Sequence, residues 1–186
     1  SKAENALRRL HTAVVDVNEL RVCLPSELTD ILGERYPKVS ERALRIRATL
    51  NDIFTREHEV SLARLKDMPK RDARKYLESL EGAPQFVTAR VVLVSLGAHA
   101  TPVDDRLLTR LLEDAVFEAG TTIEQAASLL ERHVKATDGL EAHHAMLAWA
   151  DSPTKGGRAK SSRASKKKTT KKAASSRSRS KRAAGK

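Results

Sequence analysis

The sequence predicts an all-α body followed by a disordered, strongly basic tail. Apolar residues recur at three- and four-residue spacing through most of residues 1–150, which is typical of amphipathic helices, and no segment alternates as a strand does. Residues 151–186 carry 14 of the 35 Lys and Arg residues, one of the 24 Asp and Glu residues, and no large apolar side chain. Such a segment cannot offset its own ordering entropy. We therefore expect two domains, 1–150 and 151–186.

The first third of the chain predicts three helices. The stripe Leu7, Leu10, Val14 and Val17 indicates a first helix over residues 7–17. Residues 25–33 form a second, which begins at a proline and ends at a glycine. The third is predicted to begin at Ser40 as its N-cap and to run through residue 54.

The middle of the chain predicts two helices joined by a tight turn. After a short turn at 61–66, Pro69 breaks the chain and residues 71–80 follow the helical period. Residues 81–84 form the tight turn. Residues 85–96 are apolar almost all round, so we expect a helix that is buried on most sides and ends before Gly97.

Three further helices complete the body, which gives about eight in all. Asp104 or Asp105 is expected to cap the first of them. Thr121 and Glu124 have the spacing of a capping box at the start of the second. The third spans residues 140–149, and Pro153 with a following Gly-Gly pair at 156–157 marks the boundary with the tail.

Composition excludes several classes of protein. No apolar run reaches the roughly 18 residues that a membrane span needs, and the first 25 residues contain no secretory signal. Cys23 is the sole cysteine, which excludes an internal disulfide and favours a reducing intracellular setting. His143 and His144 are adjacent on one helix, so they point about 100° apart and are interpreted as packing or surface residues. We therefore expect neither a metal site nor a cofactor.

The tail carries the clearest functional signal. Its dense cations predict binding to duplex DNA by counterion release; if about 8 engage phosphates, log K falls with log salt at a slope near −7. It has no aromatic residue to stack on bases, so little sequence preference is expected. A solubilising or nuclear-import tail is an alternative. The cations expected to bind DNA are Lys166, Lys167, Lys168, Lys171, Lys172, Arg177, Arg179, Lys181 and Arg182.

The hairpin at 77–97 is a second candidate for DNA contact. A glycine turn between two helices can direct backbone N–H groups and a helix N-terminus at one phosphate. The residues expected to do so are Gly82, Ala83, Gln85, Val87 and Thr88. On spacing alone, however, an ordinary helix C-cap at Gly82 and an ordinary N-cap at Asp104 are the simpler interpretations.

This part of the chain resembles a known family, the helix-hairpin-helix DNA glycosylases of the endonuclease III superfamily. The resemblance covers roughly residues 60–150. It is carried by Leu80-Glu81-Gly82-Ala83-Pro84-Gln85-Phe86-Val87-Thr88-Ala89, by the apolar stretch to Gly97, by Thr101-Pro102-Val103-Asp104 with Arg110 downstream, and by Ala142-His143-His144-Ala145-Met146-Leu147. The family pattern is Leu-Pro-Gly-x-Gly-x-Lys-Thr-Ala, an apolar helix, then Val-Asp-Thr-His-x-x-Arg.

The resemblance implies recognition of a damaged base, extrusion of the nucleotide and cleavage of its glycosidic bond. It assigns the catalytic carboxylate to Asp104, whose charge would stabilise a positively charged sugar. Phe86 stands at the position of the family's lyase lysine, so the implied enzyme is a monofunctional glycosylase without Schiff-base chemistry. Pro84 replaces the second hairpin glycine, and the family's iron–sulfur cysteines are absent.

Three functions remain open at this point. The chain is a monofunctional glycosylase, a catalytically degenerate DNA-binding module, or a nucleoid-type structural protein that compacts DNA mainly through its tail. In each case we expect a monomer bound to DNA inside the cell, in the cytoplasm or nucleoid, or in the nucleus of a eukaryote, with no membrane partner.

Overall fold

A computed structural model of the chain describes residues 2–153. This range contains helices and no strand, which confirms the all-α prediction. The α-helices are α1 (Lys2–Ala13), α2 (Val17–Val22), α3 (Pro25–Leu32), α4 (Val39–Glu57), α5 (Lys70–Glu78), α6 (Gln85–Val94), α7 (Asp105–Glu113), α8 (Ile123–His133) and α9 (Gly139–Asp151). Two short 3₁₀ helices, η1 (Ala63–Lys66) and η2 (Ala136–Asp138), lie between them. The Gly-Gly pair at 156–157, which was predicted to mark the boundary between body and tail, lies outside the described residues. The nine candidate tail cations also lie outside them.

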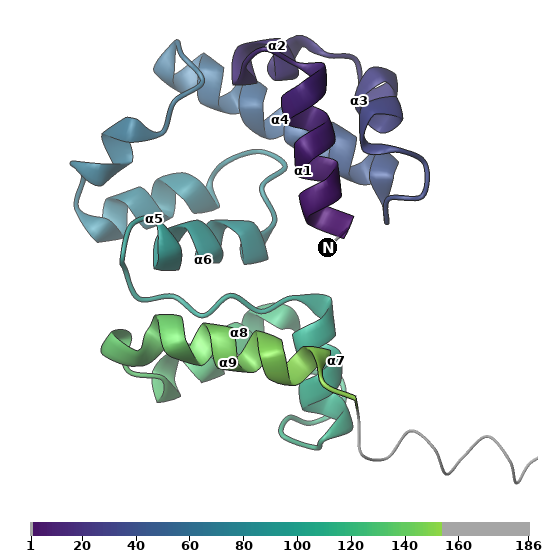
Figure 1. The fold of residues 1–186 in the computed structure, drawn as a ribbon. Coiled ribbons are helices and arrows are strands. Elements are labelled where there is room, and N and C mark those ends of the chain that lie inside the picture. Colours follow the sequence, from purple (N-terminus) through teal and green to yellow (C-terminus); the bar gives the residue numbers. More distant parts are fainter. Residues whose placement is uncertain (1, 154–186) are drawn as a thin grey trace, which may run out of the picture. The chain divides into compact units, whose positions relative to one another are not determined.

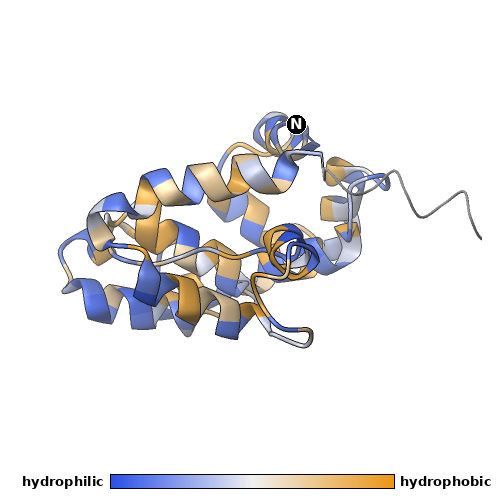
Figure 2. Ribbon diagram, turned by 90° about the horizontal axis from the view of Figure 1, so that it is seen from below, coloured by the Kyte–Doolittle hydropathy of each residue, from blue (hydrophilic) through white to orange (hydrophobic). Residues whose placement is uncertain are grey.

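Residues 1–150 form one compact unit. Its first four helices pack together: α1 lies against α3, and both α2 and α3 lie against the long helix α4 (Figure 1). The apolar residues buried in these helices include Ala6, Leu28, Leu32 and Ala43. Hydrophilic and hydrophobic residues alternate along the helices in Figure 2, as amphipathic helices require.

Two larger apolar clusters hold the rest of the unit. The first joins α4, η1, α5 and α6, and its buried residues are Ile53, Leu65, Ala73, Leu77, Leu80, Val92, Leu93, Leu96 and Ala100. The second joins α7, α8 and α9, with Val103, Leu107, Leu111, Ala126 and Ala127 buried and Met146 and Trp149 packed against them. The segment between α6 and α7 therefore passes from one cluster to the other.

The predicted first helix is two helices. The chain breaks after α1 because Asp16 caps α2, accepting a hydrogen bond from the backbone N–H of Glu19 at 2.7 Å. The predicted stripe is not buried either. Leu7 and Val17 are more than half exposed, and Ala6 is the residue of α1 that is buried.

Two predicted N-caps are shifted by one or two residues. The helix expected to begin at Ser40 begins at Val39, because the carbonyl of Lys38 already accepts a hydrogen bond from the backbone N–H of Arg42. The capping box predicted for Thr121 and Glu124 is formed by Thr122 and Gln125. Glutamine performs the reciprocal role of glutamate there, while the Thr121 hydroxyl donates to the carbonyl of Glu118 at 2.8 Å.

Helix α6 is buried on one side, not on most sides as its composition predicted. Thr88, Val92 and Leu93 face the interior, whereas Val87 and Val94 are about half exposed. Helix α6 ends at Val94 with Ser95 as its C-cap, two residues before the predicted end. Gly97 follows this end with φ +57°, and Ala98 bonds back to the carbonyl of Val92 at 3.0 Å.

Candidate functional site

The hairpin turn between α5 and α6 presses against α4. Gly82 takes φ +73°, a conformation that favours glycine. A Cβ atom at this position would lie 3.0 Å from the carbonyl oxygen of Arg45 and 3.1 Å from the Cβ of Ala48. Glycine is therefore required twice at this turn, by its backbone conformation and by the closeness of α4.

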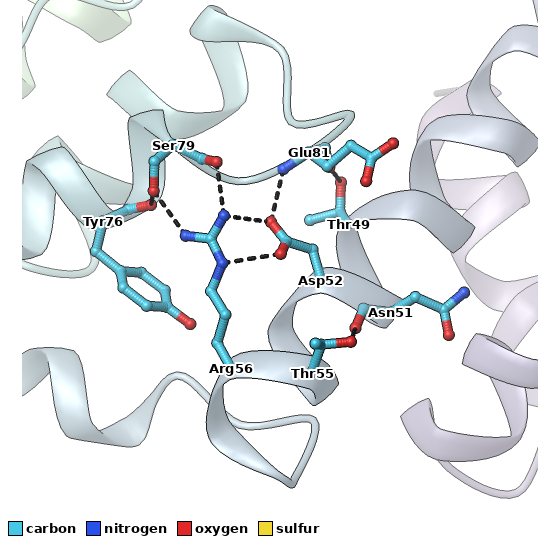
Figure 3. Close-up of polar contacts among 8 residues, drawn as sticks. All are labelled: Thr49, Asn51, Asp52, Thr55, Arg56, Tyr76, Ser79 and Glu81. Carbon is cyan, nitrogen blue, oxygen red and sulfur yellow. Dashed lines mark hydrogen bonds and ion pairs between the residues drawn. The ribbon is translucent and has the colours of Figure 1, made fainter.

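Polar contacts from α4 fix the same turn (Figure 3). The Asp52 carboxylate accepts a hydrogen bond from the backbone N–H of Glu81 at 2.9 Å, and the Thr49 hydroxyl donates to the carbonyl of Glu81 at 2.8 Å. Arg56 forms an ion pair with Asp52 at 2.7 Å and donates to the carbonyl of Ser79 at 2.9 Å. One backbone amide at the tip of the hairpin is thus bonded within the protein.

These contacts also set the pKa of Asp52. Partial burial alone would raise it, but the hydrogen bond from Glu81 and the charge and hydrogen bond of Arg56 outweigh burial and hold the pKa below its ordinary value. The carboxylate is therefore ionised at neutral pH, and its charge strengthens both hydrogen bonds.

The beginning of α6 divides the predicted hairpin residues between solvent and interior. Pro84 occupies the N-cap position without a side-chain cap, and the first turn contains no acidic residue. Gln85 is exposed and Val87 is 46% exposed. Thr88 is buried, and its hydroxyl donates to the carbonyl of Gln85 at 3.0 Å. Ala83 is half-buried against the first apolar cluster.

Asp104 is confirmed as the N-cap of α7. One carboxylate oxygen accepts a hydrogen bond from the backbone N–H of Leu107 at 2.9 Å. The other accepts from the Nε of Arg106 at 3.1 Å. The preceding residues 101–103 are buried, and the Asp104 side chain is 21% exposed. The carboxylate is thus held in one orientation at the boundary between interior and solvent.

His143 on α9 lies within electrostatic range of this carboxylate. Its side chain is fully buried, and neither ring nitrogen has a hydrogen-bonding partner among residues 2–153. Burial, followed by the charges of Arg90 and His144, lowers its pKa, while the charge of Asp104 raises it by a smaller amount. The imidazole is therefore neutral at pH 7. Its ring lies 6.4 Å from that of Phe86 at the start of α6.

The fold therefore brings the start of α6, Asp104 and His143 into one region, although they are far apart in the sequence. A fixed and partly exposed carboxylate such as Asp104 can stabilise a positive charge that develops nearby, or accept a proton from water. Gly82 faces α4 and belongs to a different side of the hairpin from Gln85 and Val87.

Sequence reasoning missed Asp52 and did not decide between a packed and an exposed His143. His143 is buried, in a stripe with Gly139, Met146 and Ala150, which agrees with its interpretation as a packing residue. That spacing was visible in the sequence, in competition with the stripe of Leu140, His144 and Leu147. Asp52 was missed because its partner is a backbone amide 29 residues away, which no local pattern reveals.

Comparisons with known proteins add no family. No protein-family profile matches the chain, and no curated protein sequence matches it with significance. Among residues 2–153, no three His, Cys, Asp or Glu side chains lie together in a group that could hold a metal ion. No helix in this part of the chain is long and apolar enough to cross a bilayer.

Proposed function

We propose that this chain binds duplex DNA with little sequence preference, as a monomer inside the cell, and that its basic tail supplies most of the affinity. The division of charge carries the proposal. Residues 151–186 hold 14 cations and one acid, whereas residues 1–150 hold 21 cations and 23 acids. A body that is nearly neutral cannot attract a polyanion over a distance, but a tail of this density can.

The helical body supports the same proposal. Helix α6 begins without a side-chain cap and without an acidic residue in its first turn, next to the exposed Gln85. The positive end of its helix dipole is therefore open to a phosphate group. The hairpin is held rigidly by α4, so a phosphate bound there would meet a preformed surface.

The proposal is tested by salt-dependent binding to a labelled duplex. The full chain is expected to lose affinity with a log–log slope near −7, and a chain ending at residue 153 is expected to bind orders of magnitude more weakly with a much flatter slope. A full-length control with its nine candidate tail cations changed to glutamine separates charge from length. Equal binding by the truncated chain would contradict the proposal.

A second function, hydrolysis of the glycosidic bond of a damaged base, is favoured by Asp104. Its carboxylate is held by hydrogen bonds from Leu107 and Arg106 and remains partly exposed. In this proposal Asp104 stabilises the positively charged sugar or activates water. No lyase step follows, because Phe86 stands at the position where the resembled glycosylases have their lyase lysine.

Duplexes carrying uracil, oxidised, alkylated or mismatched bases test this second function. Alkali-dependent strand cleavage at one lesion, lost in Asp104→Asn, is the expected result. Tight, salt-sensitive binding to every duplex without cleavage would favour the degenerate module instead. DNA bridging or compaction by the same protein would then favour a nucleoid-type structural role.

A further inference from the structure

The N-terminal helix presents cations around a hollow surface. Helix α1 lies against α3, and Ala6 is its buried residue. Two hollows of about 660 and 520 Å³ lie where α1 meets the end of α3 and the segment after it, and they share Asn5 and Arg9 as lining residues. We call this surface the α1/α3 groove. Its cations are Lys2, Arg8, Arg9 and Arg35.

None of these four cations forms an ion pair with a carboxylate of residues 2–153. Arg8 donates to the side-chain oxygen of Asn5, and Arg9 donates to the carbonyl of Leu32 at 3.2 Å; both acceptors are uncharged. Elsewhere in the body, arginines such as Arg56 form ion pairs. Asp30 and Glu34 also line the groove, which leaves it with a surplus of two positive charges.

One hydrogen bond positions the side chain of Arg9, which is otherwise exposed. Its guanidinium donates to the carbonyl of Leu32 and lies next to Gly33. Gly33 has φ +87°, a backbone conformation that favours glycine. A guanidinium held in this way loses less conformational entropy when it binds an anion.

We propose that the α1/α3 groove binds the phosphodiester backbone of DNA as a second contact surface beside the tail. Phosphates in protein–DNA complexes are contacted by Arg and Lys, by Asn, Thr and Tyr side chains, and by backbone amides. The groove combines its cations with two such neutral groups, from Asn5 and Tyr36, while the hydroxyl of Thr12 donates to the carbonyl of Arg8 at 2.9 Å. This inference rests on the proposed DNA binding.

The basic tail determines which anion reaches the groove. The tail and the groove carry charge of the same sign, so their charges do not favour the tail as the ligand of the groove. A duplex held by the tail, in contrast, is presented to the body at a high effective concentration. A groove with a surplus of only two charges can then contribute measurable affinity.

Removal of two groove cations from the full chain tests the inference. Arg8→Gln with Arg35→Gln leaves Arg9 in place and is expected to flatten the salt slope by about 2 and to weaken binding about tenfold or more at 0.1 M salt. The matched control, Arg132→Gln with Lys135→Gln, removes two exposed charges at the end of α8 and is expected to change binding less. Equal effects of the two pairs would overturn the inference.

Crosslinking locates the contact directly. In a Cys23→Ser background, Thr12→Cys places a thiol in the groove and Ser128→Cys places one on an exposed part of α8. With a duplex that carries a disulfide-reactive tether on its backbone, the first is expected to crosslink and the second is not.

The outcomes separate this inference from the proposed function. If the full chain binds DNA with a steep salt slope but the groove neither crosslinks nor changes the slope, the inference fails and the proposed function stands. If the full chain does not bind DNA, both fail. If the Arg8 and Arg35 substitutions weaken binding to polyglutamate or to anionic vesicles but not to DNA, the groove belongs to another partner and the inference is overturned.

Discussion

The carboxylate of Asp52 accepts a hydrogen bond from the backbone amide of Glu81 at 2.9 Å, and this contact attaches the tip of a helical hairpin to a helix that ends 24 residues earlier. The same carboxylate is paired with Arg56, which in turn holds the carbonyl of Ser79 (Figure 3). The orientation of α5 and α6 relative to α4 therefore depends on a charge as well as on apolar packing.

We expect Asp52→Asn to destabilise the body by about 1–3 kcal/mol, because it weakens a charge-assisted hydrogen bond and removes the ion pair. Since the pKa of Asp52 is lowered in the folded protein, its contribution is present above the ordinary aspartate value near 4 and is lost as pH falls through the lowered pKa. Urea unfolding at pH 7 and pH 3 measures both effects. Glu59→Gln, at an exposed position, is the control; an equal loss in both variants would contradict the role of Asp52.

We expect Gly82→Ala to be more destabilising than Gly97→Ala by about 1 kcal/mol or more. Both glycines have positive φ, so both substitutions carry backbone strain. At Gly82 the new methyl group also meets the carbonyl of Arg45 at 3.0 Å, whereas nothing lies within 4 Å of a Cβ at Gly97. The difference between the melting temperatures of the two variants measures the effect of the contact with α4. Equal melting temperatures would show that this contact does not affect stability.

We expect the stability of the body to fall as pH drops below about 6.5, in part because of His143. Its pKa is lowered by burial in the folded protein, so the unfolded chain binds the proton more readily in the window between the lowered pKa and the ordinary one. His143→Leu should flatten this dependence, and at pH 7.5 it should not destabilise the protein strongly, because it removes two buried atoms without partners among residues 2–153.

Melting temperatures between pH 5 and pH 8 measure this effect. His11→Gln, which changes an exposed histidine, is expected to keep the dependence of the parent protein. If His143→Leu and the parent protein lose stability in parallel as pH falls, another group is responsible for the loss.

We expect substitutions at Asp104 to separate stability from chemistry. Asparagine is as good an N-cap as aspartate, so Asp104→Asn should unfold within about 0.5 kcal/mol of the parent, whereas Asp104→Ala should lose about 1 kcal/mol. Base excision, in contrast, should be lost in both. Urea unfolding and the cleavage assay are run on the same preparations. If Asp104→Asn cleaves normally, Asp104 acts as a helix cap and has no catalytic role.

The all-α class and several helix ends can be predicted from the amino-acid sequence alone. Gly33 ends α3 as predicted, and Asp104 caps α7. These features depend on the backbone preferences of one residue and its near neighbours, so local reasoning is sufficient for them. Where two candidate caps are adjacent, as at Thr121 and Thr122, their local energies are similar, and the packing of the following helix selects between them.

The side of each helix that is buried depends on the packing of the helices against one another. The helical period identifies a stripe of residues, but neighbouring helices determine whether that stripe has a surface to cover. For this reason Leu7 and Val17 are exposed while Ala6 is buried, and Val87 on the apolar helix α6 faces solvent. The electrostatic effect of Asp104 on His143 and the hydrogen bond from Glu81 to Asp52 likewise arise between distant parts of the chain, which come together only when the helices pack.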